Sequence, residues 1–263
     1  MLFRQLFDPD TWLYIGKGTE TMLFRQLFDF DTCSYTYLVA DAGTKAAALI
    51  DPVLEQVERD LKLLNELGLT LKFCLETHIH ADHVTGTGKL RELTECEGIV
   101  PENAHAACAD RYLSHGDVLM VGDIKISAIE TNGHTDSHMA YLVDDTHVLT
   151  GDALFIRGCG RTDFQSGDAG TLYDRVTQRL FALPDDTLVY PAHDYRGQTV
   201  STIGEEKQWN PRFVGKTRAA FIQFMDALDL PDPQKMMEAV PANEQCGRIV
   251  HWRRDRTPSD PPG

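Results

Sequence analysis

The sequence predicts an α/β fold of the αββα sandwich type, in which helices cover the outer faces of two packed β-sheets. Two observations support this prediction. Short apolar runs of strand length alternate along the chain with amphipathic segments of helical period. Side chains of metal-ligand type directly follow several of these runs, beside Gly or Pro, as they do in loops at strand ends. We therefore expect a metal site at one edge of the two sheets.

The expected strands are spread over most of the chain. Each is a short apolar run bounded by turn residues such as Gly, Asp and Pro. The runs are residues 35–40, 46–50, 71–75, 98–100, 118–121, 125–130, 139–143, 147–150 and 187–190.

The expected helices carry apolar residues at helical spacing on one face. In the first of them, Pro52 suits the first turn, Val57 and Leu64 belong to the apolar face, and Gly68 suits the C-terminal cap. The others lie around residues 89–93 and at residues 171–183, 205–209 and 217–228. Such apolar stripes are more often part of a core than contacts to a cofactor.

The chain begins with a duplication. Residues 1–8 recur unchanged as residues 22–29, a match too long for chance. Only the second copy runs directly into a strand pattern, so we interpret residues 1–21 as a duplicated N-terminal segment. Residues 22–250 are then the domain, with the second copy as its first strand. Residues 251–263 are charged and rich in proline, which predicts a disordered tail.

Composition excludes several classes of partner. The formal net charge is −15, whereas nucleic acid and anionic membranes both require a basic face. No apolar run approaches the roughly 18 residues of a membrane span, and the N-terminus lacks the apolar core of a secretory signal. The six cysteines have no CxxC spacing, and we interpret them as reduced thiols. A cytoplasmic location is therefore expected.

The stretch that carries the chemistry is residues 77–83, Thr-His-Ile-His-Ala-Asp-His, which follows the apolar run at 71–75. Neutral imidazoles and carboxylates are preferred ligands of zinc, iron and manganese, and a loop at a strand end can direct several of them to one point. The alternative is a solvated polar turn with chance histidines. That alternative does not explain why further ligand types recur downstream.

Three further candidate ligands follow short apolar runs in the same way. They are His134 in Gly-His-Thr, Asp152 in Thr-Gly-Asp and His193 in Pro-Ala-His. A lone histidine of this kind is more often a hydrogen-bonded structural residue. The combination of these residues with the HxHxDH pattern favours a shared metal site.

The strings T-H-I-H-A-D-H, G-H-T, G-D-A and P-A-H-D-Y resemble the metallo-β-lactamase superfamily over roughly residues 24–247. Within it, the string LFIRGCGRTDFQ at residues 154–165 is similar to the persulfide dioxygenase (sulfur dioxygenase) branch. The shorter strings at 171–173, 190–195, 199–202, 210–212 and 240–243 are similar to it as well. The resemblance implies the metallo-β-lactamase fold and the oxidation of glutathione persulfide by O2 and water to sulfite and glutathione, in sulfide detoxification. It also implies a homodimer.

The resemblance further implies one Fe(2+) ion per chain, held by the catalytic residues His78, His134 and Asp152. Two histidines and one carboxylate on one face of an iron ion leave positions for water, O2 and substrate. Other residues are expected to surround this site and orient its ligands. They are His80, Asp82, His83, His193 and Asp194.

The number of metal ions stays open at this stage. Dinuclear relatives also use the positions of His80, Asp82, His83 and His193, and all four residues are present. The alternative function is therefore a glyoxalase II-type hydrolase of glutathione thioesters with two metal ions and a bridging hydroxide. The segment after Gly160 resembles the dioxygenase branch instead, and the longer C-terminal substrate domain expected of glyoxalase II is missing. A non-catalytic metal-binding module is the third reading, which the complete set of donors disfavours.

Glutathione carries two carboxylates, so arginines and a phenol are expected beside the metal site. Arg161, Tyr195 and Arg212 lie in the branch-specific strings and are the candidate substrate-binding residues. A guanidinium group offers a forked, permanently charged donor that matches a carboxylate. Alternatively, Arg161 pairs with Asp163 or Asp194 and braces its loop, and Tyr195 is structural.

Overall fold

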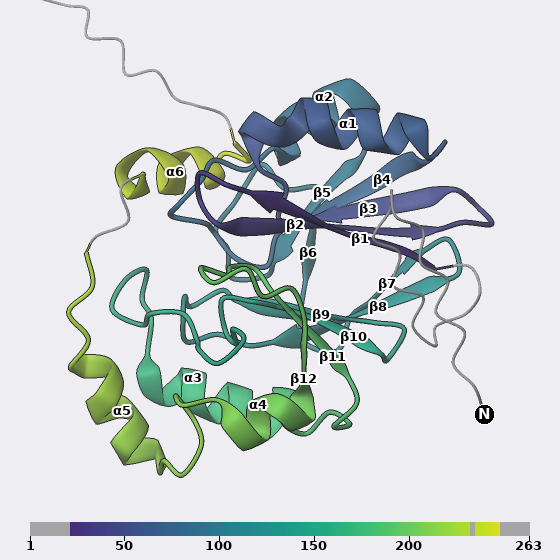
Figure 1. Cartoon of the computed structure of the whole chain (residues 1–263). Coiled ribbons are helices and arrows are strands. Elements are labelled where there is room, and N and C mark those ends of the chain that lie inside the picture. The colour runs from purple at the N-terminus through teal and green to yellow at the C-terminus, as the bar shows by residue number, and fades with distance from the viewer. Residues whose placement is uncertain (1–21, 232–234, 248–263) are drawn as a thin grey trace, which may run out of the picture.

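The computed structural model describes residues 22–231 and 235–247 (Figure 1). It confirms the predicted αββα sandwich, because two six-stranded sheets face each other and helices lie on both outer faces. The predicted duplicate segment 1–21 and the predicted tail 251–263 lie outside the described residues.

The first sheet follows the order of the chain. Its strands are β1 (Met22–Asp29), β2 (Ser34–Asp41), β3 (Ala46–Ile50), β4 (Thr70–Leu75), β5 (Glu97–Pro101) and β6 (Arg111–Leu113). The pairs β1–β2 and β2–β3 are antiparallel, and β3, β4, β5 and β6 pair in parallel. The carboxyl ends of β3 and β4 therefore meet at one edge of this sheet.

The second sheet also follows the order of the chain. Its strands are β7 (Val118–Val121), β8 (Ile124–Glu130), β9 (Met139–Val143), β10 (His147–Gly151), β11 (Leu188–Pro191) and β12 (Ser201–Thr202). The neighbours are antiparallel except for β10 and β11, which are parallel. The carboxyl ends of β10 and β11 thus leave this sheet together.

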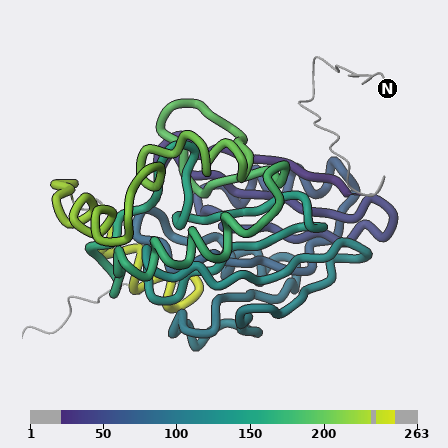
Figure 2. The backbone as a smooth tube through the Cα atoms, turned by 90° about the horizontal axis from the view of Figure 1, so that it is seen from below, coloured from purple at the N-terminus to yellow at the C-terminus, as the bar shows by residue number. Residues whose placement is uncertain are grey.

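The helices cover the outer faces. On the first sheet lie α1 (Val57–Glu66), entered through the 3-10 turn Leu54–Gln56, and α2 (Thr87–Thr94). On the second lie α3 (Ala169–Arg175), continued by the π-helical segment Val176–Leu180, and α4 (Ile203–Trp209) and α5 (Arg218–Asp226). Figure 2 views this helical layer from below, with α5 and α6 (Met236–Asn243) at one end of the sandwich. None of the helices within 22–231 and 235–247 is long and apolar enough to cross a membrane.

Alternation along the central strands builds the three layers of the core. In β2, Tyr37 and Val39 point between the sheets, whereas Leu38 and Ala40 point toward α1 and α2. Successive side chains of a strand face opposite sides, so a strand buried on both faces reads as a continuous apolar run. A matching layer under α3 and α5 includes Phe221, which is fully buried.

Several sequence predictions of elements need correction. Pro52 lies before the 3-10 turn and outside α1, while Gly68, in the left-handed region at φ +63°, does follow the helix end as predicted. The strands β6 and β12 and the helix α6 were not predicted. The first two have only three and two residues, which is too short to show a period, and α6 contains Pro241, which argues against a helix in sequence.

The interpretation of all cysteines as reduced thiols is wrong for two of them. Cys108 and Cys246 form a disulfide across 138 residues of sequence. Spacing patterns detect local motifs, and they cannot detect a pair that only the fold brings together. The remaining cysteines are free, as predicted: Cys33, Cys74, Cys96 and Cys159.

Two leucines of α2 offer a matched test of this packing. Leu90 is completely buried, whereas Leu93 is 53% exposed. We expect Leu90→Ala to lower the free energy of unfolding by about 2–5 kcal/mol, because it leaves a cavity between α2 and the first sheet. Leu93→Ala should change it by no more than about 0.5 kcal/mol. Urea denaturation of both variants measures the difference, and equal effects would contradict the packing of α2.

Candidate metal centre

The histidine loop, residues 76–86, begins where β4 ends and is anchored to the neighbouring strand by Asp51. This buried residue directly follows β3. Its Oδ1 accepts the amide hydrogen of Thr77 at 2.7 Å, and its Oδ2 accepts the hydroxyl hydrogen of the same residue at 2.8 Å. Because β3 and β4 are parallel neighbours, the carboxylate fixes the backbone at the point where the loop leaves the sheet.

Thr77 transmits this constraint to His78. Since the threonine hydroxyl donates its hydrogen to Asp51, it accepts one from Nδ1 of His78, 2.9 Å away. This assigns the ring proton to Nδ1 and leaves the Nε2 lone pair for a metal ion. Burial, together with the neighbouring imidazoles, holds the pKa of His78 well below its usual value, so the ring is neutral.

His134 is oriented by the backbone of the GCGRTDFQ segment. Its Nδ1 donates to the carbonyl oxygen of Arg161 at 2.6 Å, which again leaves Nε2 as the acceptor atom. Gly160 allows this close approach. A Cβ atom there would lie 2.9 Å from Nδ1 of His134 and 2.5 Å from the carbonyl oxygen of Asp152. The backbone of the GCGRTDFQ segment therefore orients the candidate ligand His134.

Asp152 follows β10 and is held from both sides. Its Oδ1 accepts a hydrogen bond from Nδ1 of His193 at 2.7 Å, and its Oδ2 lies 3.4 Å from Nε2 of His134. Its backbone N–H donates to Nε2 of His138 at 2.9 Å. Burial alone would raise the pKa of Asp152, but the charge and hydrogen bond of His193 outweigh it and lower the pKa to about 2. The carboxylate is thus ionised and directed inward.

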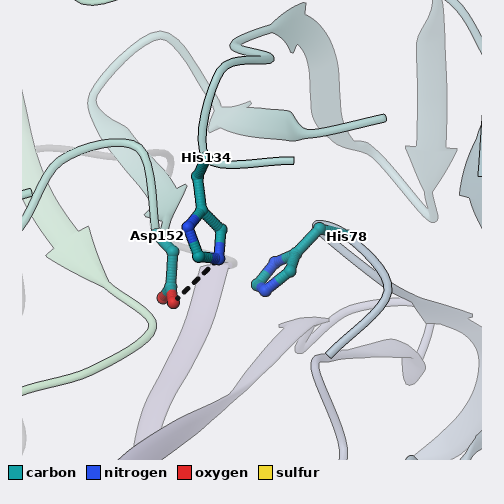
Figure 3. A group of neighbouring side chains, drawn as sticks. All are labelled: His78, His134 and Asp152. Atoms are coloured by element: carbon teal, nitrogen blue, oxygen red, sulfur yellow. Dashed lines mark ion pairs between the residues drawn. The ribbon is translucent and has the colours of Figure 1, made fainter. Parts of the chain in front are cut away.

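The structure brings the three predicted ligands together. One donor atom from each of His78, His134 and Asp152 lies within 4.8 Å of the others. Figure 3 shows the two rings and the carboxylate converging from three separate segments. The chemistry of this set, two imidazole nitrogens and one ionised oxygen, fits a divalent transition-metal ion.

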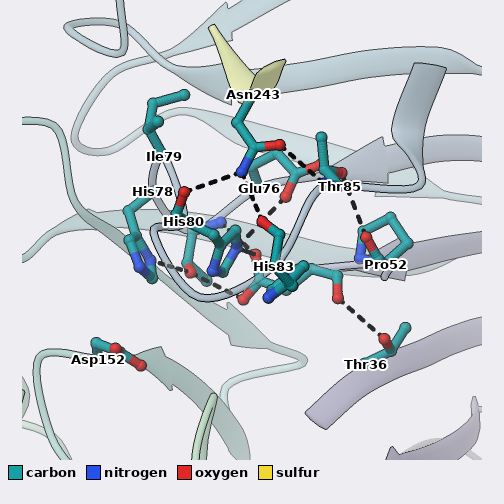
Figure 4. A network of polar contacts seen from close by, with 12 residues as sticks. Thr36, Pro52, Glu76, His78, Ile79, His80, His83, Thr85, Asp152 and Asn243 are labelled. Atoms are coloured by element: carbon teal, nitrogen blue, oxygen red, sulfur yellow. Dashed lines mark hydrogen bonds and ion pairs between the residues drawn. The ribbon is translucent and has the colours of Figure 1, made fainter. Parts of the chain in front are cut away.

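His80, in the same loop, lies with its ring centroid 4.1 Å from that of His78, but its Nε2 faces two carboxylates. Its Nε2 lies 3.1 Å from Oδ1 of Asp51 and 3.5 Å from Oε2 of Glu76, and all three side chains are buried. Figure 4 shows His80 and Glu76 in this network. Burial alone would lower the pKa of His80, but the carboxylates outweigh it and raise the pKa well above its usual value. The second imidazole of the motif is therefore surrounded by the carboxylates of Asp51, Glu76 and Asp82.

Three of the other predicted neighbours, His83, Asp82 and His193, contact one another in a chain. Asp82 lies 2.9 Å from Nδ1 of His83 and 3.0 Å from Nε2 of His193. Burial would raise the pKa of Asp82, but both imidazoles outweigh it and keep the pKa well below its usual value. In the same way, Asp152 and Asp82 overcome the burial of His193 and raise its pKa well above the usual value. Asp194 is different, because its Oδ2 accepts from the amides of Arg196 and Gln198 and so braces its own turn.

Sequence reasoning missed His138. It is buried, stacks on His78 with ring centroids 5.0 Å apart, and accepts the amide hydrogen of Asp152. Because Nε2 is the acceptor, Nδ1 donates to the hydroxyl of Thr131, 2.8 Å away. Burial is the main cause that lowers the pKa of His138 to about 3. Its only sequence signal is its position four residues after His134, which by itself indicates no function.

The candidate substrate residues differ in their surroundings. Arg161 forms a two-pronged ion pair with Asp163, with both nitrogen–oxygen distances at 2.7 Å, and donates to the carbonyl of Pro231. This is the bracing role named above as the alternative. Tyr195 is 71% exposed, and its ring lies parallel to that of His193 at 6.0 Å between centroids. Arg212 lies over the ring of Phe224, 4.6 Å from its centroid.

Comparison with known proteins gives consistent results. A family model described as the Metallo-beta-lactamase superfamily matches residues 31–193. The mouse (Mus musculus) protein "Persulfide dioxygenase ETHE1, mitochondrial" is 48% identical over 217 residues, covering 82% of this chain and 85% of that protein. The crystal structure of ETHE1 from Myxococcus xanthus has a TM-score of 0.85 at 53% identity, covering 86% of this chain and 100% of that one. The hydroxyacylglutathione hydrolase of Rhodospirillum rubrum is 38% identical over 165 residues, covering 62% of each.

Two glycines of one loop test how His134 is positioned. A Cβ at Gly160 would overlap the ligand network, whereas at Gly158 it would meet only the side chain of Phe155 at 3.5 Å. We expect Gly160→Ala to weaken metal binding roughly 10–100-fold, as loss of ligand orientation does elsewhere. Gly158→Ala should leave it nearly unchanged. Competition titrations against a chelator measure both, and equal affinities would refute the role of Gly160.

Proposed function

The chain belongs to the metallo-β-lactamase superfamily, and within it we propose that the protein is a persulfide dioxygenase. It oxidises glutathione persulfide with O2 and water to sulfite and glutathione, in sulfide detoxification. The observation that carries the proposal is the convergence of two histidines and one carboxylate, fixed in part by the GCGRTDFQ segment. The extent of similarity to persulfide dioxygenases, over most of both chains, supports it further.

The proposed metal is one Fe(2+) ion per chain, held by His78, His134 and Asp152. A set of two histidines and one carboxylate is the usual ligand set of non-haem iron(II) oxygenases, with further positions open to other ligands. When bound, the ion would supply the electrons that activate O2 toward the soft, electron-rich sulfur of the persulfide. The hydrogen bonds at Nδ1 of both histidines support this set, since they leave both Nε2 atoms free to bind the metal.

The position of His80 supports one metal ion over two. A two-metal hydrolase would use His80 as a ligand, whereas here its Nε2 lies beside the carboxylates of Asp51 and Glu76. The hydrolase nevertheless remains the second candidate function. The ligand atoms of His80, Asp82 and His83 also lie within 4.8 Å of one another, and that group would be the start of a second site.

The surrounding residues have defined tasks in the proposed reaction. His193 donates from Nδ1 to Asp152 Oδ1 and contacts Asp82 through Nε2, so its ring links the two carboxylates. This keeps Asp152 ionised and its second oxygen turned toward the metal site. His138 fixes the backbone of the same residue. These contacts pre-organise the ligands, so little rearrangement is needed when metal and substrate bind.

For the substrate we propose that Tyr195 and Arg212 contact the glutathione moiety. Tyr195 lies on His193, next to the ligand Asp152, and is exposed enough to meet an incoming ligand. Arg212 presents a guanidinium group on the ring of Phe224, which orients the fork. Arg161 was predicted to bind substrate as well, but its ion pair with Asp163 assigns it first to bracing the loop.

The proposal includes a homodimer and a cytoplasmic location, both of which remain predictions. The mouse relative is named as mitochondrial, and the disulfide between Cys108 and Cys246 is of a kind that is rare in reducing compartments. Size-exclusion chromatography with light scattering and cell fractionation test the two points directly.

The decisive experiment combines metal content with O2 uptake. Protein purified without oxygen should carry about one iron per chain and consume O2 with glutathione persulfide while it forms sulfite. His134→Ala should lose both the iron and the activity, whereas Arg111→Ala, at an exposed position of β6, should keep both. Two metal ions per chain, with hydrolysis of S-lactoylglutathione and no O2 uptake, would establish the hydrolase instead.

Substitution of Arg212 tests the substrate assignment. Arg212→Ala should raise the KM for glutathione persulfide about tenfold or more with a smaller change in kcat, because a carboxylate loses its charged partner. Arg212→Lys should recover only part of the loss, since a lysine keeps the charge but loses the fork. An unchanged KM in steady-state O2 uptake would remove Arg212 from the binding site.

A further inference from the structure

The C-terminal segment, residues 235–247, closes the histidine loop through one buried side chain. Asn243, at the end of α6, accepts the amide hydrogen of Thr85 on Oδ1 at 2.8 Å. Its Nδ2 donates to the carbonyl oxygens of His80 and His83, both at 2.9 Å (Figure 4). One side-chain amide group thus hydrogen-bonds to three backbone groups of the loop that carries the ligand His78. Without Asn243, the carbonyl of His83 and the amide of Thr85 would be buried without this hydrogen-bond partner.

The backbone of the segment also packs closely against the loop and the start of α2. A Cβ at Gly247 would lie 2.1 Å from the carbonyl oxygen of Thr85, and a Cβ at Gly88 would lie 2.3 Å from that of Cys246. Ala239 and Ala242 of α6 cluster with Val84 of the loop. The segment therefore packs directly against the loop that carries His78. The contact joins residues far apart in the sequence, since Asn243 and Thr85 are 158 residues apart.

A disulfide ties this segment to the first sheet. Cys246, three residues after Asn243, is bonded to Cys108, which lies between β5 and β6. Cys246 is 4% exposed, whereas Cys108 is partly exposed. A thiolate from solution therefore reaches the sulfur of Cys108 first, and Cys246 is the leaving group.

We propose that Asn243 is a positioning residue of the metal site and that the Cys108–Cys246 disulfide is a thiol-sensitive tether that controls it. With the disulfide closed, Asn243 stays hydrogen-bonded to the loop and His78 stays in place. Once the disulfide is reduced, the segment is held by non-covalent contacts alone, and the site releases its metal more readily. The choice of thiol rests on the proposed function, because each turnover of that reaction releases glutathione.

The redox step is an ordinary thiol–disulfide exchange. The thiolate of one glutathione attacks the Cys108 sulfur, the Cys108–Cys246 bond breaks, and the thiolate of Cys246 takes up a proton. A second glutathione attacks the mixed disulfide at the glutathione sulfur and releases the thiol of Cys108. In total two glutathione molecules are oxidised to glutathione disulfide, and the protein disulfide is reduced to two thiols.

Metal release provides the test. Holoenzyme is mixed with a coloured iron chelator, before and after reduction with a phosphine or with glutathione, and alkylation of the denatured protein counts the thiols. We expect four reactive cysteines before reduction and six after it. Iron release should become roughly tenfold faster on reduction, because several hydrogen bonds to the loop are weakened together.

Variants separate the tether from general thiol effects. Cys108→Ser should release iron fast from the outset, with no further response to reductant, whereas Cys96→Ser should respond like the wild type. Asn243→Ala should release iron fast in both redox states, and Asn243→Asp, which keeps the acceptor but loses the donors, should fall between. The visible spectrum of the cobalt-loaded protein should change in Asn243→Ala, since it reports the ligand geometry that a merely structural substitution leaves intact.

Two results would overturn the proposal. One is a native protein that already shows six reactive cysteines. The other is full reduction with unchanged iron release and unchanged hydrogen exchange of the histidine loop in the wild type. Neither measurement requires turnover, so an inactive protein with a thiol-dependent metal site would contradict the dioxygenase assignment alone.

Discussion

The carboxylate of Asp51 is the contact on which the metal centre depends. It holds the backbone and the hydroxyl of Thr77, and that hydroxyl in turn determines which nitrogen of His78 carries the proton. It also contacts His80 from behind. One buried carboxylate directly after β3 therefore gives the two histidines of the motif different roles. His78 is presented to the metal site, and His80 is kept out of it.

The architecture explains why such a carboxylate can act at this point. Parallel pairing brings the ends of β3 and β4 to the same edge, and β10 and β11 do the same in the other sheet. Asp152 and His193 arrive on those two strand ends and bond to each other across 41 residues of sequence. The metal ligands thus lie in loops that leave strand ends, and hydrogen bonds and ion pairs of buried side chains orient Asp152 and His193.

Much of this could be predicted from sequence because the relevant signals are local. Buried strands such as β3 read as apolar runs, and the ligands His78, His134 and Asp152 lie directly behind such runs. What could not be predicted depends on contacts between distant segments. Neither the direction of His80, nor the role of His138, nor the pairing of Cys108 with Cys246 leaves a trace in spacing. For Arg161 the sequence left two partners open, Asp163 and Asp194, and the fold shows that Asp163 pairs with it.

The order of strands has a consequence for the synthesis of the protein on the ribosome. Both sheets follow the order of the chain, so each can assemble as its own half emerges. The histidine loop is different, because its last partner, Asn243, is made 160 residues after His83. A nascent chain therefore has its sheets and all three ligands before Asn243 can hydrogen-bond to the histidine loop. The loop that carries His78 can therefore make all its contacts only after the segment with Asn243 has been synthesised.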